Sequence, residues 1–439
     1  MSSHERRLDV ASDPFALVRS LSQRPGAFLT FAEEGRVAYV GSDPIARSSA
    51  LDPEPDLELR PGLPAGKAPR WVGCLPYEAC RALEQGALPE TRPAPHLSVP
   101  LWLRYGAVAR VDGAVHVLGD DRLAVQELSA RLLRPSAPGP VRLALATPFE
   151  PAALHAARIE RALSEIALGN VYEVNLARRL ELTVEGTPWD LLAALADHAV
   201  PPHAFALRVP PTNGSDSGSP CAELDVCALS PELCLRLGPD RALVTRPIKG
   251  TRPRSDDAAT DARLARELDE DPKERAELTM ILDVERNDLG RVATTGSVRV
   301  TRLPHVVSLA AVHHRLATLE AELRSDVSRA ELLRGFLPSG SVTGAPKRRA
   351  MQLIAELEPH RRGLYTGAVG FVRHDGGLEL AMAIRTLTAR AGIGHFFTGG
   401  GIVADSNASL EVEETLWKAR PILTFLDRPD GRLAENFPD

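Results

Sequence analysis

The amino-acid sequence predicts a mixed α/β or α+β fold built on large β-sheets, and three observations support this class. From Ala27 the chain alternates short apolar runs, such as AFLTF and RVAYV, with turn residues, which is typical of strands and hairpins. Further along the chain, strand-like and helix-like segments interleave. No fixed-period repeat occurs, so a solenoid or propeller is not expected.

The composition is that of a globular chain, with 44% hydrophobic and 25% charged residues. A length of 439 residues suggests roughly two to four domains. The net charge of −6 argues against a bulk nucleic-acid binder, which would usually be basic. No apolar run approaches the roughly 18 residues that cross a bilayer, and MSSHERRLDVASDPF lacks the apolar core of a secretory signal. We therefore expect a cytoplasmic protein with no membrane and no nucleic-acid partner.

The cysteines fit neither a disulfide framework nor a metal knuckle, because their number is odd and their spacings are wide. We expect scattered reduced thiols in a cytoplasmic protein: Cys74, Cys80, Cys221, Cys227 and Cys234.

The first part of the chain is expected to be rich in strands. Residues 1–12 and 427–439 resemble frayed ends. Strands and hairpins continue through residues 94–119, and DRLAVQELSARLL predicts a helix over about 121–133. The Pro-rich segment RPSAPGP, near 134–140, is a candidate boundary.

The second part predicts helices and strands in alternation. A helix over 151–169 leads into a strand over 171–184, and the polar segment 210–220 is expected to form a long hairpin loop. A long helical segment is expected over about 256–285. The later predicted elements are SVRV, a helix near 327–335, a helix after Pro346, GAVGFVR, LELAMAIRTLTAR, HFFTGGGI and a last helix from about 409 to 426.

Two predicted helices each carry a pair of glutamates three residues apart. Glu274 and Glu277 share one helix face, as do Glu411 and Glu414, and Lys418 follows four residues later. Mg²⁺ typically binds one or two protein carboxylates and takes its other ligands from water and substrate. From spacing alone, a solvated face stabilised by ion pairs is the commoner explanation.

Two glycine-rich segments are candidates for anion binding. In GSVTGAPKRRA, Ser341, Thr343 and Lys347 lie at the start of a predicted helix, where free backbone N–H groups favour an anion. TGGGIVADS is a second predicted loop, whose glycines would allow close approach to a ligand. Neither segment matches a nucleotide-binding motif, and such turns more often carry no ligand.

Lysine is rare in this chain, since only five of the 52 Lys and Arg residues are lysine. Lys249 lies in the strand-like VTRPIKGTRPR, and Glu232 lies in ALSPELCLRL. A lysine can act as a nucleophile if burial or cationic neighbours lower its pKa, and Arg246, Arg252 and Arg254 flank this one. A glutamate in a partly apolar site can act as a general acid. The alternative is a surface lysine among basic residues.

Several motifs together resemble the chorismate-binding enzymes: PIKGTRPR, ERAELTMILDVERNDLGRV, GSVTGAPKRRAMQLI, YTGAVGF, AIRTL, and GGGIVADS followed by ETLWKA. This family contains anthranilate synthase component I, aminodeoxychorismate synthase component I, and the isochorismate and salicylate synthases. The resemblance implies the chorismate-utilising enzyme fold, a large two-sheet antiparallel β-sandwich flanked by helices. It also implies a chorismate-binding catalytic domain over 151–427, after an N-terminal region, 1–150, that is loosely similar to that of anthranilate synthase component I.

The resemblance implies a specific reaction, because aminodeoxychorismate synthases resemble P-I-K-G-T whereas anthranilate synthases typically have Ala at the position of Lys249. Neutral Lys249 would add to ring carbon C2 of chorismate as the C4 hydroxyl leaves, protonated by Glu232. Ammonia would then enter at C4 and expel the lysine, giving 4-amino-4-deoxychorismate for the 4-aminobenzoate branch of folate synthesis. Mg²⁺ would join the ring carboxylate to Glu277 and Glu414, supported by Glu274 and Glu411.

The resemblance also assigns the remaining site residues. Tyr365, Arg385, Gly400 and Lys418 would hold the substrate carboxylates, Thr343 would contact the ring carboxylate, and His314 would line the site. Its neighbour His313 would point away, because adjacent residues of a strand face opposite sides. The chain departs from the family at Glu173, where amine-forming members usually have Gln. We hypothesise that Glu173 takes a proton from incoming ammonium.

The ammonia source is expected to be a separate glutamine amidotransferase subunit, because the chain has no G-x-C-x-G glutaminase motif and Cys74 lies in VGCLPYE. Two alternatives remain. One is anthranilate synthase component I, which eliminates pyruvate, and the other is a catalytically silent chorismate-binding subunit.

Overall fold

The computed structural model describes residues 4–62, 66–82, 92–134, 136–196, 199–211, 222–309 and 312–426. The predicted C-terminal frayed end, nearly all of the predicted polar loop over 210–220, and Cys221 lie outside these ranges. Within them, none of the helices is long and apolar enough to cross a bilayer.

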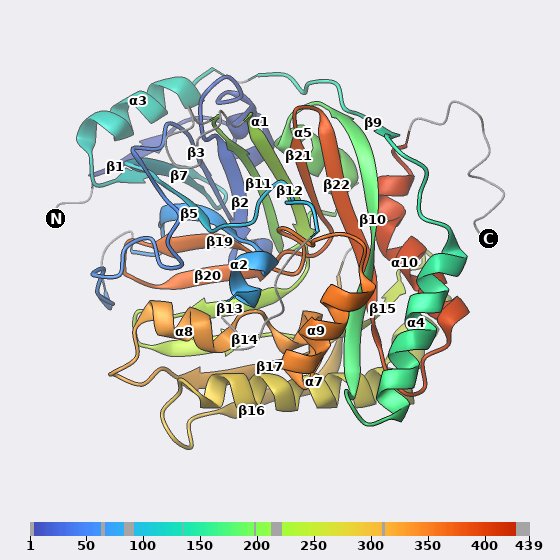
Figure 1. Cartoon of the computed structure of the whole chain (residues 1–439). Helices are drawn as coiled ribbons and strands as arrows, with labels where there is room; N and C mark the ends of the chain where they lie inside the picture. The colour runs from blue at the N-terminus through green and yellow to red at the C-terminus, as the bar shows by residue number, and fades with distance from the viewer. Residues whose placement is uncertain are drawn as a thin grey trace.

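Two large antiparallel sheets form the centre of the molecule, which confirms the predicted fold class (Figure 1). The first sheet has the order β1-β8-β7-β3-β2-β11-β12-β21-β22-β10-β18, with β9 also paired to β10. Its strands are β1 (His4–Leu8), β2 (Phe28–Ala32), β3 (Val37–Gly41), β7 (Ala107–Val111), β8 (Val115–Gly119), β9 (Arg142–Leu145), β10 (Glu173–Glu185), β11 (His203–Val209), β12 (Leu224–Ser230), β18 (Gly344–Ala345), β21 (Thr386–Arg390) and β22 (Ile393–Ile402).

The second sheet has the order β15-β17-β14-β13-β20-β19-β5-β6-β4, with β16 also paired to β17. Its strands are β4 (Ala46–Ser48), β5 (Pro69–Leu75), β6 (Leu101–Arg104), β13 (Leu233–Leu237), β14 (Ala242–Thr245), β15 (Ile248–Pro253), β16 (Arg299–Ser308), β17 (Val312–Glu322), β19 (Ala368–Arg373) and β20 (Leu378–Met382).

Helices cover the outer faces of both sheets (Figure 1). Helices α4 and α10 lie against β10 and β22, whereas α6 and α7 lie against β15 and β17. The helices are α1 (Pro14–Arg19), α2 (Tyr77–Arg81), α3 (Arg122–Leu132), α4 (Ala152–Ala167), α5 (Pro188–Ala196), α6 (Ala258–Glu270), α7 (Pro272–Gly290), α8 (Arg329–Phe336), α9 (Lys347–Leu357) and α10 (Ala408–Leu423), with the 3₁₀ turns η1 (Glu33–Gly35) and η2 (Gly340–Val342).

Apolar side chains fill the space between the sheets. Phe28 and Phe205 of the first sheet share one buried cluster with Val72 and Phe371 of the second. Burial of such large side chains is the main force that holds two sheets face to face.

The long helical segment predicted over about 256–285 consists of two consecutive helices, α6 and α7. Pro272 cannot donate the N–H that would continue α6. Asp271 then begins α7, and its carboxylate accepts hydrogen bonds from the backbone N–H groups of Lys273 and Glu274.

The predicted strand LELAMAIRTLTAR is also two elements, since β20 belongs to the second sheet and β21 to the first. Strands β12 and β13 make the same change of sheet beside them, because β12 pairs with β21 and β13 with β20. The two crossings place Glu232, between β12 and β13, near Arg385, between β20 and β21.

The predicted glycine-rich loop is likewise a strand over its first half. Gly399, Gly400 and Gly401 lie within β22 and pair with Ala177, Leu176 and Asn175 of β10. These glycines therefore line a sheet face rather than a turn.

Candidate active site

The predicted nucleophile lies where the edge strand β15 of the second sheet approaches β10 of the first. Lys249 is in β15, and its Nζ donates to Glu173 Oε1 at 2.7 Å. Nζ also lies 3.9 Å from Glu277 Oε2, which belongs to α7. All three side chains are largely buried, with exposed fractions of 10%, 0% and 9% for Lys249, Glu173 and Glu277. The structure therefore brings Lys249 and Glu173 together inside the protein.

The net effect of its surroundings is to raise the pKa of Lys249, opposite to the lowering that a nucleophilic amine needs. Burial does lower the pKa of Lys249, but the carboxylates of Glu173 and Glu277 raise it by more, so the amine rests as an ammonium. The flanking arginines do not offset this effect, because Arg252 and Arg254 form ion pairs with Asp271 and Asp261 instead.

The two predicted carboxylate pairs face one another from α7 and α10. Burial, then the charge of Glu414, raises the pKa of Glu274. Burial also raises the pKa of Glu277 to about 7, with Glu173 and Glu274 adding to the effect. Burial raises the pKa of Glu414 too, but its ion pair with Lys418 lowers it by more. Burial thus opposes the negative charge that the four glutamates would carry together if all were ionised.

Lys273 partly neutralises this cluster. Its Nζ lies 2.8 Å from Glu411 Oε1 and 3.7 Å from Glu277 Oε1, so it links α10 to α7. Glu411 Oε2 is buried and has no hydrogen-bond partner among the described residues. Carboxylate oxygens of this kind suit Mg²⁺. However, within the described ranges no group of three or more His, Cys, Asp or Glu side chains could hold a metal ion by itself.

Glu232, the predicted general acid, is buried at the crossing between the two sheets. Its backbone carbonyl accepts from the N–H of Met382, and Ser341 Oγ donates to its Oε1 at 3.0 Å. Burial raises the pKa of Glu232 to about 7, although Ser341 and the cations of Lys249, Lys418 and Arg385 act to lower it. A carboxyl with this pKa can hold a proton near neutral pH and release it.

Arg385 and Lys418 supply the positive charge near Glu232. Arg385 has a φ of +50°, which is unusual for a non-glycine residue and typical of functional sites. No described residue accepts a hydrogen bond from its guanidinium, and burial lowers its pKa. Lys418 donates to the carbonyl of Gly399 at 2.9 Å. The guanidinium of Arg385 is therefore available to an anion.

His314, Thr343 and Tyr365 complete the predicted set. Thr251 Oγ1 and His314 Nδ1 lie 2.9 Å apart, and Nε2 of His314 is buried without a hydrogen-bond partner among the described residues. Burial, then Arg385, lowers the pKa of His314 to about 3, so the ring is neutral. Thr343 is buried and donates to the carbonyl of Ser339 at 2.9 Å. Tyr365 stacks on Phe397 with ring centroids 5.3 Å apart.

The glycines of β22 leave room for these charged groups. A Cβ at Gly401 would lie 2.3 Å from Glu173 Oε1 and 3.0 Å from Lys249 Nζ. A Cβ at Gly400 would lie 3.2 Å from Glu411 Oε2 and 3.5 Å from Glu414 Oε1. Neighbouring strand positions face opposite sides, so each glycine accommodates a different carboxylate group.

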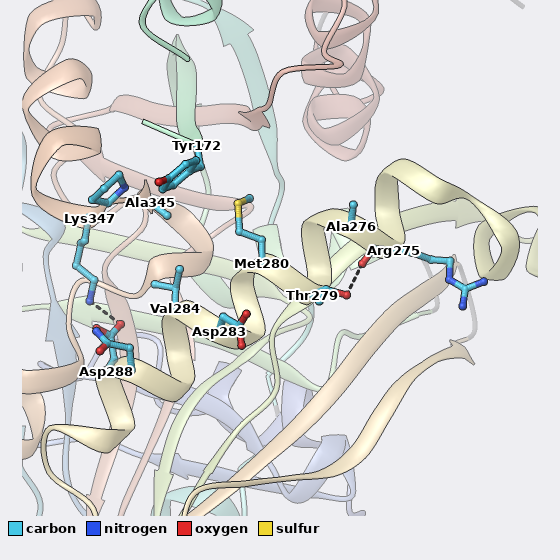
Figure 2. Close-up of a pocket in the computed structure, with 12 residues that line it drawn as sticks. Tyr172, Arg275, Ala276, Thr279, Met280, Asp283, Val284, Asp288, Ala345 and Lys347 are labelled. Atoms are coloured by element: carbon cyan, nitrogen blue, oxygen red, sulfur yellow. Dashed lines mark hydrogen bonds and ion pairs between the residues drawn. The ribbon is translucent and has the colours of Figure 1, made fainter. Parts of the chain in front are cut away.

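Lys347 does not join this site. Its Nζ donates to Asp288 Oδ2 at 2.6 Å, and both residues line a pocket of about 850 Å³ along the outer face of α7 (Figure 2). Tyr172, on the opposite wall, is 66% exposed, whereas its neighbour Glu173 points inward. None of the glutamates described above lines this pocket.

Sequence reasoning missed Lys273 as a counterion, Glu285 as a buried acid and Arg362 as a structural link. Arg362 donates to the carbonyls of Val342 and Asn175, which connects the segment carrying Thr343 to β10. The rarity of lysine was the one signal that could have identified Lys273.

Comparison with known proteins identifies relatives of this chain. A family model for chorismate binding enzymes matches residues 3–424. A relative from Streptomyces coelicolor, named anthranilate synthase component 1, is 36% identical over 434 residues, which cover 90% of this chain and 82% of the relative. A relative from Escherichia coli, named aminodeoxychorismate synthase component 1, is 41% identical over 260 residues, which cover 59% of this chain and 54% of the relative.

Solved structures show the same fold. Anthranilate synthase component I from Streptococcus pneumoniae superposes with a TM-score of 0.68 at 26% identity, covering 91% of this chain and 90% of the other. The menaquinone-specific isochorismate synthase of Escherichia coli superposes with a TM-score of 0.74 at 20% identity, covering 97% and 94%.

Proposed function

The chain belongs to the family of chorismate-binding enzymes, and on that premise we propose that it converts chorismate and ammonia into 4-amino-4-deoxychorismate. The observation that carries the proposal is Lys249, a buried amine that lies between Glu173 and Glu277 with the carboxyl of Glu232 nearby. A nucleophile and a general acid on one substrate allow a hydroxyl group to be replaced in two displacements.

Substrate binding is assigned to the cations of the site, because chorismate is a dianion. The guanidinium of Arg385 and the ammonium of Lys418 would each pair with a carboxylate, and Thr343 would contact the ring carboxylate. Tyr365 would add its hydroxyl, and Gly400 would allow the ring to approach α10. The unpartnered Nε2 of His314 would accept or donate one further hydrogen bond.

Catalysis in this proposal begins with the loss of a proton from Lys249, and Glu173 Oε1 at 2.7 Å is the nearest acceptor. The free amine then adds to C2 while the C4 hydroxyl leaves as water, with the proton supplied by Glu232. Ammonia adds at C4, and the C2–N bond to Lys249 breaks. The departing amine takes back the proton held by Glu173, and the ammonium group formed at C4 releases the proton that restores Glu232, so the site returns to its starting state.

A magnesium ion is part of the proposal. Glu277 and Glu414 would hold it, with Glu274 and Glu411 in support, and the buried, unpartnered Oε2 of Glu411 is an oxygen that suits such a cation. When bound, the ion would neutralise the carboxylate cluster and the ring carboxylate of the substrate.

Ammonia is proposed to come from a separate glutamine amidotransferase. The described cysteines, Cys74, Cys80, Cys227 and Cys234, are all buried, and burial raises the pKa of each thiol. Such thiols are poor nucleophiles, which argues against a glutaminase site within the described part of the chain.

Anthranilate synthesis is the second candidate, because the relative that matches along most of its length carries that name. Lys249 argues against it, since anthranilate formation by elimination of pyruvate does not require a buried amine beside C2. A silent chorismate-binding subunit is a third candidate, but it would not need Glu232, Lys249 and all four glutamates together.

Product analysis tests the proposal. The chain would be incubated with chorismate, Mg²⁺ and an ammonium salt, alongside Lys249→Ala and, as a matched control, the exposed Lys67→Ala. We expect 4-amino-4-deoxychorismate from the wild type and Lys67→Ala, and none from Lys249→Ala. Anthranilate as the direct product, or no turnover at any ammonium concentration, would overturn the proposal.

A further inference from the structure

We propose that Glu285 is a proton reserve for Glu232, connected to it through the hydroxyl groups of Ser339 and Ser341. This inference rests on the proposed function, because it deepens the part assigned to Glu232. Glu285 touches neither the substrate site nor Lys249 in this structure, so we describe it as a positioning residue that acts through Glu232.

An unbroken hydrogen-bonded chain joins the two carboxyl groups. Ser339 Oγ lies 3.0 Å from Glu285 Oε1, and Ser341 Oγ lies 3.0 Å from Glu232 Oε1. The two hydroxyl oxygens lie 3.1 Å apart, and either one can be the donor. Thr245 Oγ1 donates to the other oxygen of Glu285 at 2.9 Å.

Every residue of this hydrogen-bonded series is shielded from solvent. Glu285 and Ser339 are 1% and 0% exposed, and Ser341 and Glu232 are 5% and 4% exposed. Burial in a low-dielectric interior favours the neutral form of a carboxyl. Two such carboxyls, linked by two hydroxyl groups, therefore resemble one proton-sharing pair rather than two independent acids.

The transfer needs no further reactant. Glu285 gives its carboxyl proton to Ser339 Oγ, Ser339 gives its hydroxyl proton to Ser341 Oγ, and Ser341 gives its own to the carboxylate of Glu232. Each hydroxyl can donate and accept, so both stay neutral once their O–H bonds rotate. The net change moves one proton from Glu285 to Glu232.

The charged and titratable groups around the pair hold the shared proton on Glu285 until Glu232 has given up its own. Glu285 faces Glu232, Asp288 on its own helix and the thiol of Cys234 on β13. Glu232 faces the cations of Lys249, Lys418 and Arg385. Burial, then Glu232, raises the pKa of Glu285 to about 8, whereas the pKa of Glu232 is about 7. Glu285 therefore keeps its proton at a pH where Glu232 has begun to lose its own.

The outer end of the route lies close to solvent. Asp288 follows Glu285 by one helical turn, and its ion pair with Lys347 lines the pocket on the outer face of α7 (Figure 2). Water in that pocket is the source from which Glu285 would regain its proton.

The first test is the pH dependence of amination with an ammonium salt. After the wild-type pair loses one proton, the other is shared between Glu285 and Glu232, so activity should decline gradually until the second loss. In Glu285→Gln only Glu232 titrates, so the alkaline limb of kcat should become steeper and move down by about half a pH unit. Ser339→Ala should give the same shift, and the double variant Glu285→Gln/Ser339→Ala should give no larger shift. The exposed Glu267→Gln should give no shift.

The outcomes separate this inference from the proposed function. A wild type that makes no aminated product would overturn the proposed function. An aminating wild type with an unmoved alkaline limb in Glu285→Gln would overturn the proton reserve, even if kcat fell uniformly, because a purely structural residue lowers activity without moving the limb.

A second measurement does not depend on activity. Infrared difference spectra of the chorismate-free protein at pH 7 should show one buried protonated carboxyl that Glu285→Gln lacks and Glu267→Gln retains. A carboxylate band in its place would overturn the inference.

Discussion

Burial acts in opposite directions on the two acid–base residues of the site. It raises the pKa of Glu232 to about 7, which makes this carboxyl a proton donor near neutral pH. It also lowers the pKa of Lys249, but the nearby carboxylates of Glu173 and Glu277 outweigh that effect. The acid is therefore ready in the resting protein, whereas the amine must first lose a proton.

In the proposed mechanism, Glu173 takes that proton from Lys249. Glu173→Gln keeps the shape and the hydrogen bond but removes the base, so we expect ammonia-dependent kcat to fall about 100-fold. Steady-state kinetics with an ammonium salt would measure this, and Glu185→Gln, exposed on the same strand, is the control. Unchanged turnover would remove Glu173 from the proton transfer.

Gly401 allows the Lys249–Glu173 ion pair to lie against β22. In Gly401→Ala the new methyl group would lie 2.3 Å from Glu173 Oε1, so we expect the pair to separate and turnover to be lost. Gly290→Ala is the matched control, because a Cβ there meets nothing within 4 Å. Activity assays and thermal unfolding would compare the two variants, and full activity in Gly401→Ala would contradict this role.

At the scale of elements, the site depends on two helices whose carboxylates repel one another. Lys273 links Glu411 of α10 to Glu277 of α7 and offsets part of this repulsion without a metal ion. In Lys273→Met we expect a lower Tm than in the wild type and a larger rise in Tm when Mg²⁺ is added, because the ion replaces the lost charge. Calorimetry with and without EDTA would measure both, with Lys67→Met as the control. A Tm that does not respond to Mg²⁺ in either protein would contradict a metal at these carboxylates.

Local patterns predicted most elements but not where the chain changes direction or sheet. The helices over 121–133 and 151–169 are confirmed as α3 and α4. The break at Asp271–Pro272 was readable from the proline but was overlooked. The change of sheet between β20 and β21 was not readable, because an uninterrupted apolar run does not reveal that its halves pair with strands far away in sequence.

The same limit applies to the site. Spacing and family motifs identified the glutamates, Lys249 and Glu232, because each is visible within a short segment. The electrostatic surroundings of Lys249 could not be predicted, because its neighbours in sequence are arginines while its neighbours in space are carboxylates. Lys273 was missed for a similar reason, because its partner Glu411 is 138 residues away.

At the scale of the whole molecule, the two sheets join both parts of the chain. Strand β2 lies between β3 and β11, and β5 lies between β19 and β6. The hydrogen bonding of both sheets therefore joins residues on either side of position 150. The division of the chain at that position stays a prediction from the sequence.

This interleaving predicts that residues 151–427 do not fold alone. Without β2 and β5, strands β11 and β19 would lose a hydrogen-bonded neighbour, and Phe205 and Phe371 would be exposed. Circular dichroism and denaturant unfolding of the fragment should show no cooperative transition, and co-expression with residues 1–150 should restore one. A cooperatively folded fragment would establish an independent domain.

The central claim is that the amine of Lys249 bonds to the chorismate ring, and trapping that bond tests it most directly. The protein would be mixed with chorismate and Mg²⁺ without ammonia, quenched with acid, and analysed as intact protein and as peptides by mass spectrometry. We predict a gain equal to chorismate minus one water on the peptide that contains Lys249, absent from Lys249→Ala. Aminated product formed at the normal rate by Lys249→Ala, or an adduct located on another residue, would contradict the account.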